Sequence, residues 1–177
     1  MPMENTGKTY GEEEFVLMTA MDSETIQRRI NNAIKDIPTA IGMNNHQGSK
    51  ASADQHVMSN VAKVMKDREM FFIDSRTTVE TIGETTMEVF GVPTARRNIF
   101  LDNEDDEEKI EKQLMKLVKR SEKDGSAIGI GHVKPKTLNV LSDQIPRLKK
   151  MGYKFEFVSN MLLSLIHISE PTRRAII

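Results

Sequence analysis

Several short apolar stretches in this sequence end directly in side chains that can take part in chemistry. These polar ends are Asn44-Asn45-His46, Asp74-Ser75-Arg76, Asp102-Asn103 and His132. Imidazole and carboxylate groups act as general acids, general bases and metal ligands near neutral pH. Two imidazoles with one or two carboxylates are also the set of groups found in metal-assisted hydrolases.

Each of these residues also has an ordinary structural explanation. His46 lies among turn-forming residues, and His132 follows an apolar strand, where a buried histidine with a satisfied ring would fit. Asp74 could cap the helix that follows it, and Asp102 could belong to a turn. The joint pattern favours function, because two of the four histidines in the chain stand at predicted strand ends.

The elements that position these residues follow from the spacing of apolar side chains. Short apolar runs predict strands near residues 39–43, 70–73, 98–101, 126–131 and 153–158, and the periodicity between them predicts helices over 22–37, 52–65, 77–90, 104–124 and 135–150. Residues 1–21 are polar and predict a loop or arm. The acidic residues that open the fourth helix suit the positive end of its dipole. Pro146 could interrupt the last helix.

Specific residues mark where two of these helices are expected to begin. Ser52 with Gln55, and Thr77 with Glu80, have the three-residue spacing of a capping box. We therefore expect one helix to start after Ser52 and another after Thr77. The second of these helices is expected to bury Val79.

The alternation of strands and helices predicts an α/β protein. Its strands are short and continuously apolar, as in a parallel sheet whose two faces are covered by helices, or in an incomplete β/α barrel. In such folds the carboxyl ends of the strands meet at one rim, where active sites gather. The polar strand ends are therefore expected to share a rim within one domain.

Composition excludes several classes of protein. The chain has 177 residues, of which 38% are hydrophobic and 29% are charged, and it contains no cysteine. A disulfide scaffold, a thiolate metal site and a cysteine nucleophile are therefore excluded. The net charge of −1 gives no overall attraction to nucleic acid or to an anionic membrane. No apolar run reaches the roughly 18 residues of a membrane helix, and the first residues lack the features of a signal peptide.

The common cofactor-binding motifs are missing from the sequence. Gly129-Ile130-Gly131 lacks the third glycine of a dinucleotide-binding loop and is not followed by a helix start. The sequence also has no phosphate-binding loop, no His-Glu-x-x-His helix, no calcium loop and no serine in a nucleophile elbow. A site made of histidine and aspartate remains.

Four blocks of sequence then stand out by their order and spacing. They are Asn44-Asn45-His46-Gln47-Gly48-Ser49, Phe71-Phe72-Ile73-Asp74-Ser75-Arg76-Thr77, Arg97-Asn98-Ile99-Phe100-Leu101-Asp102-Asn103 and Ile128-Gly129-Ile130-Gly131-His132. Together they resemble the successive motifs of the divergent polysaccharide deacetylases, over roughly residues 1–162. The resemblance implies an irregular parallel β/α barrel that is incomplete at its N-terminus in this chain. It also implies a divalent metal, usually zinc.

The resemblance implies roles for particular residues. His46 would be a metal ligand, His132 the acid that protonates the leaving amine, and Asp74 a catalytic group that orients a base or a ligand. Roles in substrate binding or in support of the site are implied for Asn45, Arg76, Arg97 and Asp102. The two arginines have a plain alternative as ion-pair partners at strand ends.

The sequence departs from the family pattern at several positions. Gln47, Asn98 and Val133 stand where the family more often has methionine, an acidic or small residue, and proline. Pro2-Met3-Glu4 resembles the end of an upstream family segment that carries a histidine. We therefore expect Met1 to be an internal position of a longer protein, with an acidic pair and a histidine before it.

The end of the chain also differs from the family. Residues 163–177 resemble a translated sequencing adapter. We therefore expect a partial deacetylase-like domain over residues 1–162, followed by a non-native tail. His167 lies in that tail and is not considered for the site.

The expected function is that of a metal-dependent hydrolase that removes N- or O-acetyl groups from a polysaccharide or an acetylated sugar oligomer. Neither a nucleic-acid partner nor a membrane segment is expected. The alternative is a non-catalytic carbohydrate-binding or cell-envelope protein on the same barrel. A chain without the first strands of the family is expected to be inactive alone. The family implies a location outside the cytoplasm or in the cell envelope.

Overall fold

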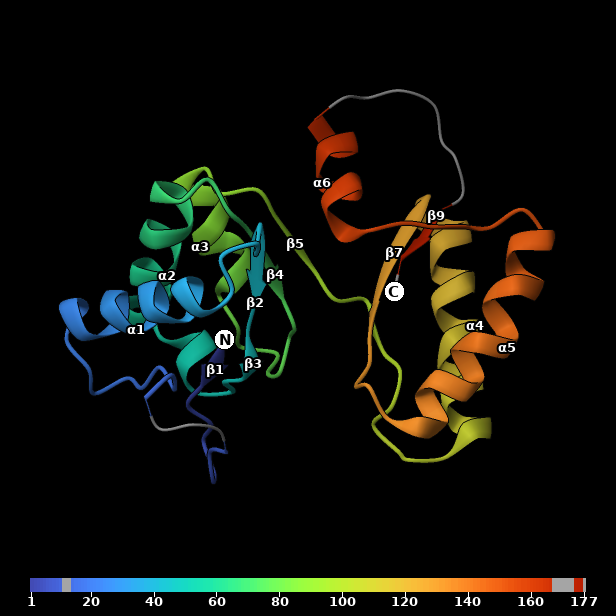
Figure 1. The fold of residues 1–177 in the computed structure, drawn as a ribbon, viewed down its shortest axis with the longest axis horizontal. Helices are drawn as coiled ribbons and strands as arrows, with labels where there is room; N and C mark the ends of the chain where they lie inside the picture. The colour runs from blue at the N-terminus through green and yellow to red at the C-terminus, as the bar shows by residue number, and fades with distance from the viewer. Residues whose placement is uncertain (11–13, 167–173, 177) are drawn as a thin grey trace. The chain divides into compact units, whose positions relative to one another are not determined.

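A computed structural model of the protein describes residues 1–10, 14–166 and 174–176 (Figure 1). The chain divides into two compact units, Met1–Arg96 and Arg97–Ile177. Each unit has its own hydrophobic core. Among the described helices, none has the length and apolar character needed to cross a membrane.

The first unit contains two parallel sheets. The three-stranded sheet has the order β2-β4-β5, and the two-stranded sheet pairs β1 with β3. The strand bounds are β1 Pro2–Met3, β2 Gly42–Asn44, β3 His46–Gln47, β4 Phe71–Asp74 and β5 Thr94–Arg96. Because β3 follows β2 after a single residue, the chain leaves one sheet and enters the other at Asn45.

Helices pack beside these strands (Figure 1). Helices α1 and α2 bury most of the apolar residues that the periodicity predicts to face inward, whereas the predicted inward residues Ile37 and Val89 are exposed. Their bounds are α1 Ser23–Asp36, the 3-10 helix η1 Ala51–Ala53, α2 Gln55–Asp67 and α3 Gly83–Phe90. The core of the unit gathers around Phe72 of β4, with Ile30 from α1 and Met58 from α2. The start of α1 is capped by Asp22, whose Oδ1 accepts the Thr25 N–H at 2.7 Å.

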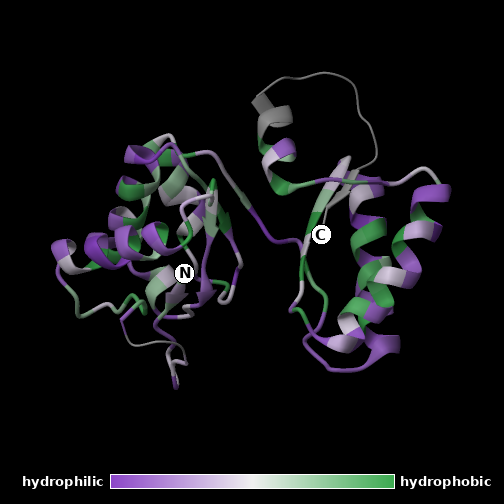
Figure 2. Ribbon diagram, in the orientation of Figure 1, coloured by the Kyte–Doolittle hydropathy of each residue, from purple (hydrophilic) through white to green (hydrophobic). Residues whose placement is uncertain are grey.

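The second unit contains one parallel sheet with the strand order β6-β7-β9-β8. The bounds of its elements are β6 Ile99–Phe100, α4 Glu107–Asp124, β7 Ser126–Ile130, α5 Pro135–Lys150, β8 Lys154–Phe155, α6 Val158–Ile166 and β9 Arg174–Ile176. Helix α4 contacts both β7 and α5. Figure 2 shows hydrophobic and hydrophilic residues alternating along α4, whose buried residues include Leu114 and Leu117.

The predicted parallel α/β class is confirmed. Every strand pair in the described residues is parallel, and none of the three sheets closes on itself, as expected for an incomplete barrel. The acidic run does open α4, with Asp106 as its cap, and Gly125 ends the helix in a left-handed conformation. Helix α5 continues through Pro146 without a break.

The predicted starts of two helices are wrong. Ser52 lies in η1, and α2 is capped by Asp54, whose Oδ1 accepts the Val57 N–H at 2.9 Å. Helix α3 begins only at Gly83, and Val79 is 88% exposed rather than buried. The local capping pattern at Thr77 fails because the chain after β4 is held in a turn by a buried carboxylate, described below.

The prediction that residues 1–21 form only a loop or arm is also wrong. Pro2 and Met3 form β1, and Met3 makes a further parallel bridge to Leu17. Both Met3 and Leu17 are completely buried. The segment is polar overall, so its strand depends on a distant partner, β3, rather than on its own composition.

The predicted non-native tail, residues 163–177, includes the end of α6 and all of β9. Residues 167–173 and 177, and His167 with them, lie outside the described residues. The boundary at residue 162 stays a prediction.

The loop after β3 depends on a glycine, and this yields a stability prediction. Gly48 has a φ of +87°, and a Cβ at this position would lie 2.7 Å from the Cβ of Met3. Gly91 has a similar φ of +72° but no heavy atom within 4 Å of such a Cβ. Gly91→Ala should cost about 1–2 kcal/mol of unfolding free energy through backbone strain alone. Gly48→Ala should cost about 1–3 kcal/mol more because of the overlap with Met3.

Urea unfolding of the two variants, followed by circular dichroism, measures this difference. Equal destabilisation of both variants would show that the loop moves away from Met3 at no cost.

Candidate functional site

The second unit brings together two predicted site residues, Asp102 and His132. The carboxylate of Asp102 has no solvent exposure, whereas the side chain of His132 is 46% exposed. Asp102 Oδ2 accepts the backbone N–H of His132 at 2.9 Å, and Oδ1 lies 3.1 Å from the ring Nδ1. The same carboxylate therefore holds both the backbone and the ring of His132.

Further donors complete the surroundings of the Asp102 carboxylate. The hydroxyl of Thr137, which is buried in the first turn of α5, donates to Oδ2 at 3.1 Å. The Lys134 ammonium lies 3.9 Å from the same oxygen. Burial alone would raise the pKa of Asp102, but the hydrogen bonds from His132 and Thr137 outweigh it and hold the pKa below its ordinary value.

The charge on Asp102 determines which nitrogen of His132 carries a proton. An ionised carboxylate only accepts hydrogen bonds, so Nδ1 must be the donor in the contact with Oδ1. In the neutral imidazole Nε2 is then the basic nitrogen, and it points away from Asp102. A carboxylate-oriented imidazole whose side chain is partly exposed can act as a general acid or a general base.

The aromatic ring of Phe100 contacts the imidazole of His132. The rings of Phe100 and His132 are perpendicular, with centroids 5.4 Å apart. The guanidinium of Arg97 lies over the Phe100 ring, 5.1 Å from its centroid. Arg97 is thus placed on an aromatic face, where cation–π attraction stabilises it.

In the first unit, Asp74 ends β4 and is only 1% exposed. Its Oδ1 accepts the Arg76 N–H at 2.7 Å, and its Oδ2 accepts the Thr81 hydroxyl at 2.8 Å. Arg76 has a φ of +48°, a conformation that cannot continue into a helix. These contacts hold the chain after β4 in a turn and postpone the start of α3 to Gly83.

Asn45 links this turn to the loop that carries His46. Its side chain is 1% exposed, and its Oδ1 accepts the Ser75 N–H at 2.7 Å. The Asn45 Nδ2 donates to the backbone oxygen of Gln47 at 3.3 Å. Asn45 is therefore a buried connector between the end of β4 and β3.

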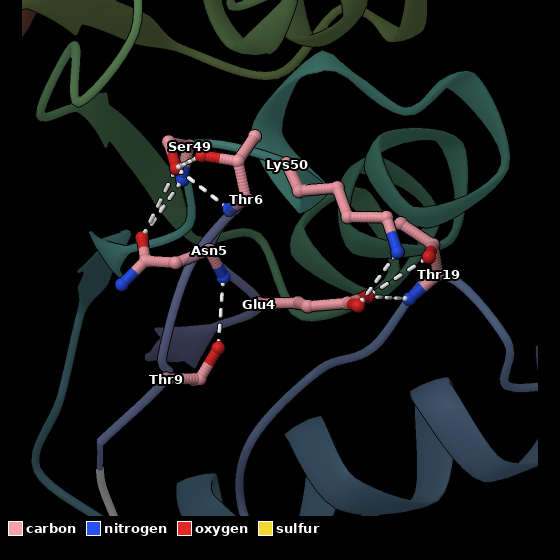
Figure 3. Close-up of polar contacts among 7 residues, drawn as sticks. All are labelled: Glu4, Asn5, Thr6, Thr9, Thr19, Ser49 and Lys50. Atoms are coloured by element: carbon pink, nitrogen blue, oxygen red, sulfur yellow. Dashed lines mark hydrogen bonds and ion pairs between the residues drawn. The ribbon is translucent and has the colours of Figure 1, made fainter.

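His46 lies at the start of β3, and its backbone N–H donates to the oxygen of Met1 at 2.8 Å. The loop that follows is held by Asn5 (Figure 3). The Asn5 Oδ1 accepts the N–H groups of Gly48 and Ser49 at 3.0 and 3.2 Å, and its Nδ2 donates to Gln47 Oε1 at 2.7 Å.

Glu4 ties the other end of the same loop to the N-terminal arm (Figure 3). Its Oε1 accepts from the Lys50 ammonium at 2.7 Å, and its Oε2 accepts from the N–H and hydroxyl of Thr19 at 2.7 and 2.8 Å. Burial would raise the pKa of Glu4, but the hydrogen bonds from Lys50 and Thr19 outweigh it and lower the pKa below its ordinary value.

The described residues do not assemble a complete metal site. Within residues 1–10, 14–166 and 174–176, no group of three or more His, Asp or Glu side chains is placed to hold an ion. His46 is the one ligand that the resemblance implies in this part of the chain. The donor set therefore fits a divalent metal only in part, and an ion at His46 would need ligands from outside the described residues.

The predicted site residues fall into two groups. Asn45, His46, Asp74 and Arg76 belong to the first unit, and Arg97, Asp102 and His132 belong to the second. Sequence reasoning missed Glu4 and Asn5, each of which bonds the loop after β3 from more than 40 positions away. It also missed Thr137; a threonine in the first turn of a helix that follows a strand-end histidine is the signal that could have pointed to it.

Comparisons with known proteins identify the family and the fold of the chain. The model of the family described as "Divergent polysaccharide deacetylase" matches residues 1–162. An uncharacterized protein of Haemophilus influenzae is 35% identical over 125 residues, which cover 71% of this chain and 45% of the relative. The uncharacterized protein YibQ of Escherichia coli is 32% identical over 136 residues, covering 77% of this chain and 43% of the relative.

The chain thus spans a little under half the length of these curated relatives. Among solved structures, that of the uncharacterized protein ATU2773 from Agrobacterium tumefaciens has a TM-score of 0.81 at 19% sequence identity. That match covers 85% of this chain and 61% of the other, and it shows a shared fold. With a family model matched over residues 1–162, the chain belongs to the divergent polysaccharide deacetylase family.

Proposed function

We propose that the full-length protein hydrolyses acetyl groups on a polysaccharide or an acetylated sugar oligomer. The observation that carries this proposal is the pair formed by buried Asp102 and partly exposed His132. Membership of the divergent polysaccharide deacetylase family supports a carbohydrate substrate.

In the proposed reaction His132 is the catalytic acid. Water adds to the acetyl carbonyl as one of its protons passes to solvent, and the bond from the carbonyl carbon to the sugar nitrogen or oxygen then breaks. The protonated imidazole gives its Nε2 proton to that departing atom. The acetic acid formed releases its remaining proton and the imidazole takes up a proton from solvent, so the net products are acetate, one proton and the free amine or hydroxyl. Asp102 is a positioning residue, because it keeps Nδ1 protonated and stabilises the imidazolium before the proton is transferred.

The residues of the first unit have proposed roles in positioning. Asn45 and Asp74 hold the backbone of Ser75 and Arg76 at the end of β4. Asn45 would orient the His46 loop or bind substrate hydroxyls, and Arg76 would support the carboxylates or the substrate. His46 is proposed as one ligand of a divalent metal, such as zinc, in the full-length protein, together with ligands from outside the described residues.

The activity prediction concerns His132. In the full-length protein, His132→Gln should lower kcat for acetate release from acetylated sugar oligomers by about 10²–10⁴-fold, because the leaving group loses its acid. His56→Gln is the matched control, since His56 is exposed on α2. Acetate release is measured by an enzyme-coupled assay. Absence of turnover in the unsubstituted protein, with retained binding of the oligomer, would instead support the non-catalytic carbohydrate-binding alternative.

The metal prediction concerns His46. In the full-length protein, His46→Ala should weaken zinc affinity by at least about tenfold, because an imidazole ligand is lost. Zinc content after equilibrium dialysis is measured by elemental analysis, with His56→Ala as the control. Full zinc occupancy in His46→Ala at the same free zinc concentration would remove His46 from the ligand set.

A third prediction concerns the pH dependence of stability. Because the pKa of Asp102 is lower in the folded chain, its ionised carboxylate stabilises the fold above its ordinary pKa of about 3.9. This stabilisation is lost as the pH falls through the folded pKa. At pH 7, Asp102→Asn should reduce the unfolding free energy by about 1.5–3 kcal/mol. The difference from the unsubstituted chain should shrink as the pH falls below about 5.

Urea unfolding of the 177-residue chain at several pH values measures this difference. Asp143→Asn, at an exposed position of α5, is the control and should stay within about 0.5 kcal/mol. A gap for Asp102→Asn that is independent of pH would show that charge is not the source of the stabilisation.

A further inference from the structure

We propose that Phe100 is a positioning residue that sets the ring plane of His132, and that Arg97 acts on His132 through Phe100. The inference builds on the proposed function, because it concerns the same catalytic acid. It starts from a chain of contacts in the second unit, in which the guanidinium of Arg97 lies over the Phe100 ring and that ring meets the imidazole of His132 at a right angle.

The contacts with Asp102 still allow the imidazole ring of His132 a range of tilt angles. The two carboxylate oxygens hold the His132 backbone N–H at 2.9 Å and the ring Nδ1 at 3.1 Å. The second torsion of a histidine joins an sp³ to an sp² carbon and has broad minima, so the ring can still tilt about its attachment. The tilt changes the direction in which the Nε2 proton points.

The perpendicular contact with Phe100 restricts this tilt. Edge-to-face aromatic pairs are favoured because the positive edge of one ring meets the negative face of the other. Such a pair adds a second angular preference to that of the hydrogen bond made by Nδ1. A typical pair of this kind changes a population or a rate by about twofold to tenfold. Asp102 and Phe100 would together aim Nε2, Asp102 through the contact with Nδ1 and Phe100 through the perpendicular ring contact.

Phe100 is itself held on two sides. It is paired with Ile130 in the sheet, and the next residue, Leu101, donates its N–H to the Ile130 oxygen at 2.9 Å. The Arg97 guanidinium lies 5.1 Å from the ring centroid. Asn98 holds the start of the strand, because its Oδ1 accepts the Ile128 N–H at 2.7 Å. The backbone of Phe100 is thus fixed in the sheet, and its ring is flanked by Arg97 and His132.

The first test measures the imidazole without any need for turnover. In the 177-residue chain, ¹⁵N chemical shifts of the His132 ring above its titration range report which nitrogen carries the proton. The unsubstituted chain should show mainly the Nδ1–H form. Phe100→Leu should lower the ratio of the Nδ1–H form to the Nε2–H form by about twofold to tenfold, whereas Phe100→Tyr, which keeps the ring, should retain it.

The second test uses the full-length protein. Phe100→Leu should lower kcat for acetate release about twofold to tenfold with little change in KM, and Phe100→Tyr should restore it. Arg97→Leu should lower kcat in the same direction. The double variant should be no slower than Phe100→Leu alone, because Arg97 acts through the ring. Thermal unfolding of each variant shows that the fold is kept.

Two results would overturn the inference. One is an unchanged tautomer ratio together with an unchanged kcat in folded Phe100→Leu. The other is additive losses in the double variant, which would give Arg97 a separate role. If the unsubstituted protein releases no acetate, the proposed function fails, but the tautomer ratio in Phe100→Leu still decides the role of Phe100.

Discussion

The buried carboxylate of Asp102 is the constraint on which the chemistry of the second unit depends. A charge without solvent contact is costly unless donors surround it, and here the donors are the His132 backbone, the His132 ring and the Thr137 hydroxyl. These groups come from the residues after β7 and from the first turn of α5. The hydrogen bonds to the Asp102 carboxylate thus join three segments: the residues after β6, the residues after β7 and the start of α5. The same bonds keep Asp102 ionised, and its charge places the proton on Nδ1 of His132.

The first unit applies the same principle at the ends of its own strands. Asp74 at the end of β4 is satisfied by the Arg76 N–H and the Thr81 hydroxyl, and this bends the chain before α3. Asn45 and Asn5 do the equivalent with neutral amides for the loops that they support. In each case a side-chain oxygen holds a backbone that lies outside regular secondary structure. Loops held in this way can present functional side chains from a rigid framework.

Predictions succeeded where the signal lies within the segment itself and failed where a tertiary contact controls the structure. The bounds of α4 follow from an acidic start, a helical apolar period and a final glycine, all of which lie within the segment. The predicted start of α3 failed because a buried carboxylate outside the helix controls the turn before it. The role of Asn5 in holding the loop after β3 could not be predicted for a similar reason, since its partners in that loop lie 42–44 positions further along the chain. Asp102 and His132 were each named from sequence, but not as a pair.

From the amino-acid sequence alone follow the parallel α/β class, the family and the residue types available for chemistry. These depend on the spacing of apolar residues and on four motifs that occur along the chain in the same order as in the family. Only the tertiary structure decided which carboxylate binds which imidazole and which aromatic ring lies beside that imidazole. The bond between Asp102 and His132 joins residues 30 positions apart. The spacing of apolar residues within one segment does not predict such a contact, because the two residues follow parallel strands that are joined by a long crossover. The contact also forms because a buried charge is costly without hydrogen-bond donors around it.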